Sequence, residues 1–200
     1  MSDLISRLFS SFSSNPQGAI PPSRVLSLRP SPRDAGLTVI HPAGYPADAP
    51  PLYSVVTSQV TKPNILFFRG GPDPSSTIGD ARFPSLSSTT NMSLHGQPIR
   101  MKMSQLSGNF TVDCPPMGRM KWHVNKLTGS PLELRDSSGD MLAQFKSAGF
   151  PGSGEKKLEI LVPCDDFFVE LVVLSGTAAK ALAKAEIDTA SEVVQAVAGA

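Results

Sequence analysis

The chain has 200 residues, of which 40% are hydrophobic, enough for one domain with a sizeable core. Its formal net charge of +1 gives no overall reason to expect nucleic-acid binding, so any basic surface must be local. The two cysteines, Cys114 and Cys164, lack the spacing of a metal or redox motif, and we expect free thiols in a reducing compartment.

Residues 1–51 have the composition of a flexible, Pro- and Ser-rich N-terminal segment. Residues 3–12 predict a short amphipathic helix, either an anchor for a membrane or partner groove or a frayed terminus. Polar residues interrupt the apolar positions, so a signal peptide is not expected. Residues 13–51 contain nine of the nineteen prolines, and we expect this segment to be dispensable for folding. Two apolar stretches, 25–28 and 37–40, are its candidate edge strands.

Short strands separated by turns are predicted from residue 52 to residue 162. In the strand around Trp122, apolar residues alternate with polar ones, which places the indole in the interior and Arg119 and Lys121 outside. Turn signals recur at the spacing of an antiparallel sandwich or barrel. The predicted strands are 52–56, 65–68, 78–83, 91–94, 99–103, 110–112, 120–124, 132–134, 141–145 and 158–162.

The longest apolar run follows these strands and predicts a buried helix over residues 166–185. Asp165 and Asp166 are suited to cap its first turn. A strand is disfavoured by the length of the run, and a transmembrane span by the charges of Glu170 and Lys180 and by the lack of a flanking basic cluster. Residues 186–200 are expected to form a tail or a short separate helix.

Residues with catalytic or metal-binding chemistry are sparse. His41, His95 and His123 are far apart in sequence and have no neighbouring cysteine or carboxylate pair, and no nucleophile elbow or phosphate-binding loop is present. We therefore expect no enzyme activity, no cofactor, no metal and no small-molecule substrate.

The basic residues give the stronger indication of a site. Arg100 and Lys102 are two apart on one predicted strand, and Arg119 and Lys121 are two apart on another. Residues at this spacing point to the same side of a strand, and apolar neighbours take the other side. The two pairs therefore form either a binding surface for anions or an ordinary solvated strand face.

The order of these elements resembles the tubby-like superfamily, which includes tubby C-terminal domains, LURP-one-related proteins and phospholipid scramblases. The resemblance rests on Trp122, the hairpin 132–145 and the helix 166–183, covers roughly residues 52–185, and is greatest to the small uncharacterised tubby-like proteins of fungi. It implies a closed, mainly β barrel of about twelve strands around a central hydrophobic C-terminal helix. It also implies phosphoinositide binding, since Arg100 and Lys102 are similar to the basic pair that tubby domains use.

Together the resemblance and the basic residues predict a non-enzymatic, cytoplasmic and monomeric binding module. Its expected partner is an anionic phospholipid or phosphoinositide membrane, contacted peripherally by Arg100, Lys102, Arg119 and Lys121. The alternative is a protein–protein adaptor or a structural barrel without lipid binding. Scramblase-like lipid transport is less favoured, because the acidic calcium-binding and Cys-rich stretches of those relatives are missing.

Overall fold

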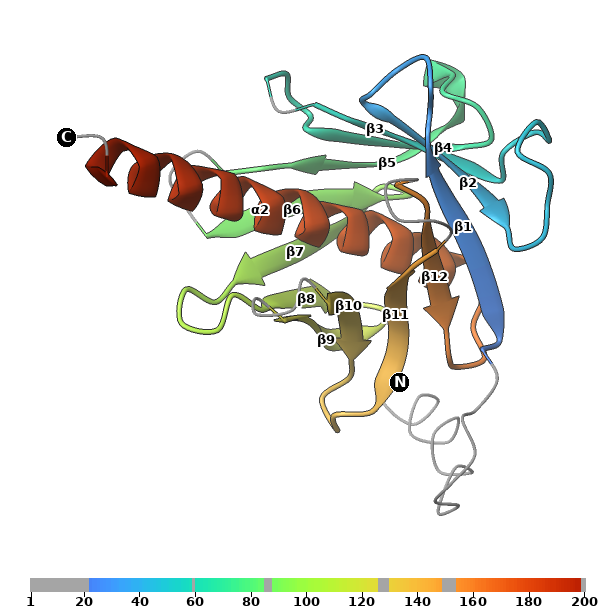
Figure 1. The fold of residues 1–200 in the computed structure, drawn as a ribbon. Coiled ribbons are helices and arrows are strands. Elements are labelled where there is room, and N and C mark those ends of the chain that lie inside the picture. The colour runs from blue at the N-terminus through green and yellow to red at the C-terminus, as the bar shows by residue number, and fades with distance from the viewer. Residues whose placement is uncertain (1–21, 59, 85–87, 126–129, 149–153, 199–200) are drawn as a thin grey trace.

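A computed structural model describes residues 22–58, 60–84, 88–125, 130–148 and 154–198 of the chain. Its main feature is a closed barrel of twelve antiparallel strands with one long helix running through it (Figure 1). This confirms the predicted fold class. The proposed helix over residues 3–12 lies outside the described residues.

The strands follow one another around the barrel in chain order, and β1 closes it by pairing with β12. A short 3-10 helix, η1 (Pro74–Ser76), lies between β4 and β5. Closure leaves none of the described strands with an open edge for another chain to pair with. The strands are β1 (Arg24–Pro30), β2 (Leu37–Pro42), β3 (Tyr53–Thr57), β4 (Ile65–Arg69), β5 (Thr77–Arg82), β6 (Thr89–Leu94), β7 (Gln97–Met103), β8 (Phe110–Cys114), β9 (Gly118–Asn125), β10 (Ser130–Arg135), β11 (Met141–Ser147) and β12 (Lys156–Ile160).

The predicted domain boundary between residues 51 and 52 is wrong. Strands β1 and β2 lie within the supposed flexible segment, yet they complete the barrel between β12 and β3. The prolines do not prevent this, because Pro30 and Pro42 end their strands and the next three lie in the β2–β3 connection. Residues 24–29 and 37–41 are therefore free to form regular ladders, and Ile40 is fully buried in the core.

Helix α2 (Asp166–Ala198) occupies the inside of the barrel with its N-terminal half. Its side chains from Phe168 to Leu174 are buried on every side of the helix, as the long apolar run predicts. Lys184 and Ala185 are exposed, so the helix leaves the barrel near these residues. The backbone remains helical to Ala198, well past the predicted end at residue 185, and Figure 1 shows α2 extending beyond the strands.

Tight contacts join the middle of α2 to the barrel wall. The Trp122 indole, fully buried as predicted, donates a hydrogen bond from Nε1 to Ser175 Oγ at 3.1 Å. Trp122 also packs against Phe145, with their ring centroids 5.7 Å apart. Gly176 lies against both rings, where a larger residue would overlap them. The wall and the helix thus fit closely at this level.

Candidate functional site

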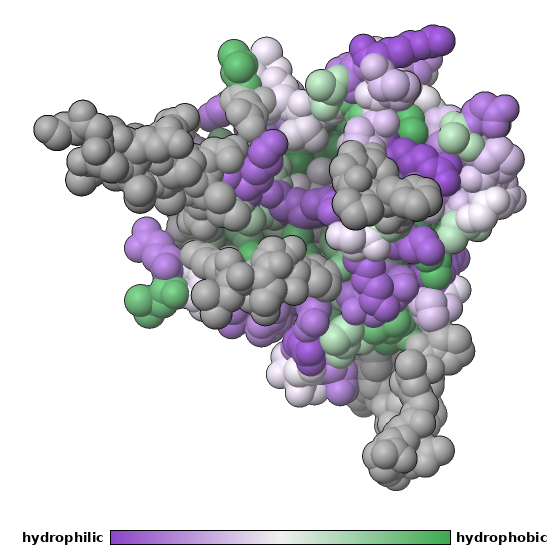
Figure 2. Space-filling model, in the orientation of Figure 1, coloured by the Kyte–Doolittle hydropathy of each residue, from purple (hydrophilic) through white to green (hydrophobic). Residues whose placement is uncertain are grey.

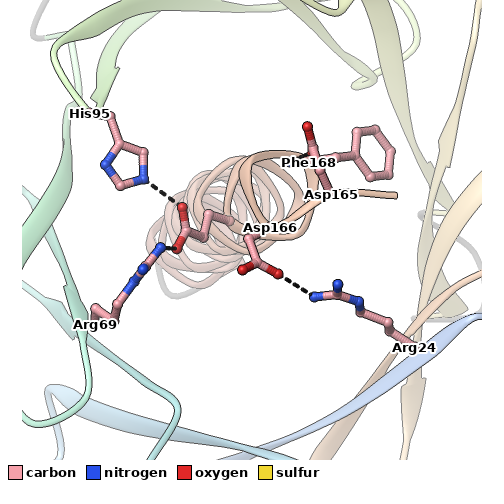
Figure 3. Close-up of polar contacts among 7 residues, drawn as sticks. Arg24, Arg69, His95, Asp165, Asp166 and Phe168 are labelled. Carbon is pink, nitrogen blue, oxygen red and sulfur yellow. Dashed lines mark hydrogen bonds and ion pairs between the residues drawn. The ribbon is translucent and has the colours of Figure 1, made fainter. Parts of the chain in front are cut away.

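A charged cluster lies where α2 enters the barrel, and Glu170 is at its centre. The Glu170 side chain is 1% exposed, yet its carboxylate has two partners from the barrel wall. Arg69 Nη2 lies 2.5 Å from Oε1, and His95 Nε2 lies 2.6 Å from Oε2. Figure 3 shows both side chains reaching inward toward the helix. A buried carboxylate is costly without such partners, so this arrangement compensates for its desolvation.

Local backbone geometry puts the two partners in place. Arg69 is the last residue of β4, and His95 is the first of the two residues that turn β6 into β7. His95 has φ 49° and Gly96 has φ 75°, the pair of left-handed conformations that a tight hairpin turn requires. Histidine tolerates this conformation better than most residues, and here its ring reaches Glu170.

Two aspartates and a tyrosine extend the cluster around the start of α2. Asp165 accepts a hydrogen bond from the Phe168 N–H at 2.8 Å, which is the predicted helix cap. Asp166 instead pairs with Arg24 Nη1 of β1 at 2.7 Å, and this hydrogen bond lowers the pKa of Asp166. Burial, followed by the nearby carboxylate of Glu170, raises the pKa of Tyr53 to about 12, so its phenol stays protonated.

This cluster is best suited to hold the helix in the barrel. Its carboxylates are paired with groups from β1, β4 and the β6–β7 turn, which fixes both the depth and the rotation of α2. Sequence reasoning did not identify Arg69 or His95. The available signal was Glu170 itself, since a charge inside an apolar run requires a partner, but nothing in the sequence indicates which residues supply it.

The four basic residues predicted as a site lie on one outer face of the barrel. Arg100 and Lys102 are on β7, and Arg119 and Lys121 are on β9, with β8 between them. Asp113 is in register with both arginines, and Thr111 is in register with both lysines. The apolar residues that alternate with them are buried, which confirms the predicted outward direction of the charges. We call these four residues the basic face.

Within the described residues, three members of the basic face have a positive charge that no carboxylate pairs with. Arg119 Nε lies 2.7 Å from Asp113 Oδ1 in an exposed ion pair. Across the described ranges, Arg100, Lys102 and Lys121 make no ion pair with a carboxylate. Two strands that flank a third are about 10 Å apart, so these charges reinforce one another at the surface.

An open hollow of about 700 Å³ adjoins the arginine side of the basic face. The guanidinium groups can reach an anion there, and Asp113 and Ser137 supply oxygen atoms that can accept hydrogen bonds from hydroxyl groups. The hollow is lined by Pro98, Arg100, Asp113, Cys114, Pro115, Gly118, Arg119 and Ser137.

The other residues considered from the sequence do not form a common site. His41 is on β2, where its Nε2 lies 2.9 Å from the Ala49 carbonyl, and His123 is on β9, where burial lowers its pKa. Cys114 and Cys164 are both free thiols. In the described part of the chain, no group of three or more His, Cys, Asp or Glu side chains is arranged to hold a metal ion.

Of the helical residues that the structure describes, none belongs to a helix both long and apolar enough to span a membrane. Comparison with known proteins found no match among protein-family models, curated proteins or solved structures.

Proposed function

We propose that the protein is a non-enzymatic, tubby-like binding module that attaches peripherally to anionic phospholipid surfaces through the basic face. The observation that supports this most is the gathering of Arg100, Lys102, Arg119 and Lys121 across three adjacent strands. On a chain with a net charge of +1, such a face is a local positive field rather than part of a general excess.

The expected attachment is weak and reversible. A basic residue near an anionic membrane contributes about 1 kcal/mol, and salt screens the attraction over roughly 10 Å. Arg119 contributes less than the others because Asp113 already neutralises it in part. Three free charges therefore supply about 3 kcal/mol, enough for salt-sensitive association but not for permanent anchoring. The hollow beside Arg100 offers room for a phosphorylated headgroup.

The test compares binding to phosphatidylcholine vesicles with and without phosphatidylserine or a phosphoinositide. The site variant is Arg100→Glu with Lys102→Glu. The matched control is Lys146→Glu with Lys157→Glu, which changes the net charge equally on another part of the wall, where these two exposed residues are in register on β11 and β12.

We expect sedimentation with the acidic vesicles only, reduced by salt and by the site variant but much less by the control. Equal loss in both variants would mean that overall charge, rather than the basic face, governs binding. Equal sedimentation with neutral and acidic vesicles would reject the proposed function and favour the protein-adaptor alternative. The melting temperature of the site variant should stay close to that of the wild type, because Arg100 and Lys102 are exposed. The control also loses the ion pair between Lys146 Nζ and Glu159 Oε2, at 2.7 Å, so we expect it to melt slightly lower while remaining folded.

A further inference from the structure

The loop between β7 and β8 presents a hydrophobic side chain to water. Leu106 is completely exposed, at 101% of its reference area. Among the other large hydrophobic side chains in the described part of the chain, only Val60, at 93%, approaches this value. Figure 2 shows hydrophobic colour on projecting tips of this face of the molecule, and the β3–β4 and β7–β8 loops project in the same view of Figure 1.

The β7–β8 loop is held in a defined shape. The Ser104 N–H donates to the Asn109 carbonyl at 2.8 Å, and the Gly108 N–H donates to the Ser104 carbonyl at 2.7 Å. Asn109 also accepts a hydrogen bond at Oδ1 from the Val124 N–H of β9, at 3.1 Å. Because these bonds already fix the loop, little further conformational entropy of the backbone is lost when a partner buries Leu106.

The position of the loop suggests the partner. It joins β7, which carries Arg100 and Lys102, to β8, which lies beside Lys121 of β9. Leu106 is four residues from Lys102, so the chain places their backbones no more than about 14 Å apart. Isolated exposed apolar residues are common on protein surfaces, but this one adjoins a cluster of free cations. In an anionic bilayer the headgroups attract basic residues, and the acyl chains beneath them accept apolar side chains. An apolar tip beside basic residues can therefore contact both layers.

We propose that Leu106 enters the acyl layer of an anionic bilayer when Lys102 and Lys121 contact its headgroups. This inference rests on the proposed function and adds the orientation of the barrel, with the β7–β8 hairpin tip toward the membrane. Val60 belongs to the connection between β3 and β4, which is separated from β7 by β5 and β6. Both connections project from the same end of the barrel, but from different points of its rim (Figure 1). With the barrel tilted so that the β7 side faces the bilayer, Val60 stays in water and serves as a matched exposed residue.

The experiment places a tryptophan at each tip, as Leu106→Trp and as Val60→Trp in separate proteins. Each is mixed with acidic vesicles whose acyl chains carry bromine, which quenches indole fluorescence only at close range. The native Trp122 is fully buried and provides the same background in both proteins. Leu106→Ser and Val60→Ser are compared in the sedimentation assay with the same acidic vesicles.

Strong quenching is expected for Leu106→Trp and little for Val60→Trp. Leu106→Ser should weaken binding by about tenfold or more while Val60→Ser leaves it unchanged, because burial of a leucine side chain is worth at least roughly this factor. Salt-sensitive binding without quenching at position 106 would refute the insertion and leave the proposed function standing. Failure of the wild-type protein to bind acidic vesicles would refute both.

Discussion

Replacing Gly176 with alanine should destabilise the protein, although the same change in most helices is stabilising. A Cβ atom at this position would lie 2.5 Å from Cε2 of Phe145 and 2.9 Å from Cζ2 of Trp122. Favourable carbon–carbon contacts are at about 3.5–4.0 Å, so the rings or the helix would have to move by roughly 1 Å. Trp122 has little freedom to move, because it is fully buried and hydrogen-bonded to Ser175.

The two opposing effects have different sizes. Alanine gains about 1 kcal/mol over glycine in intrinsic helix propensity. Overpacking a filled core costs about 1–3 kcal/mol and occasionally more, and a contact as short as this belongs at the upper end. We therefore expect a net loss of about 2 kcal/mol in the free energy of unfolding. For a chain of this size that corresponds to a melting temperature lower by about 4–8 °C.

Thermal and urea unfolding, followed by far-UV circular dichroism and by Trp122 fluorescence, would measure this change. Thr177→Ala is the matched control, since it also raises helix propensity on the next residue but adds no atom. The control should be neutral or slightly stabilising. A Gly176→Ala protein with an unchanged or higher melting temperature would show that the aromatic pair yields readily, and the reasoning from close packing would fail.

Two further predictions concern the closure of the barrel and the partly buried side chain of Lys180. Deleting residues 1–42 removes β1 and β2, so we expect the cooperative unfolding transition to be lost. Deleting only residues 1–21 should preserve that transition, and calorimetry of the two proteins would show whether it does. Lys180 has a pKa lowered to about 8 by burial and by nearby Lys156. Between pH 8 and about 10.5 the unfolded chain therefore binds more protons, and stability should rise with pH in that interval. Lys180→Met should raise the unfolding free energy at pH 7 and remove this part of the rise, and urea titrations at several pH values would show whether it does.

Much of the fold could be predicted because its determinants are local. Alternation around Trp122 and the long apolar run beginning at Phe167 are visible in short windows of sequence, and both have the predicted burial. The strands β1 and β2 were not predicted to be integral parts of the barrel. They pair with β12 and β3, which sequence windows around them do not include, and prolines are frequent at their ends. Composition averages over such a segment and does not reveal where each proline falls.

Of the two candidate sites, the basic face could be predicted from the sequence and the Glu170 cluster could not. The basic face follows from the period of two along strands and from the order of the hairpins, so its members could be named in advance. The Glu170 cluster joins residues 69, 95 and 170, whose meeting depends on how far α2 slides into the barrel. No local pattern encodes that depth. The hollow beside Arg100 could not be predicted either, because it is lined by residues from separate turns and strands between Pro98 and Ser137 whose arrangement depends on the closed barrel.

The pairing of β1 with β12 has a consequence for synthesis on the ribosome. These strands are separated by 125 residues between Pro30 and Lys156, and the helix that fills the barrel follows both of them. While the chain emerges, the inner faces of the early strands have no partner to cover them, so complete folding waits for the last segment. A nascent chain that stalls before α2 would expose apolar strands, and such chains should be strong clients of ribosome-associated chaperones.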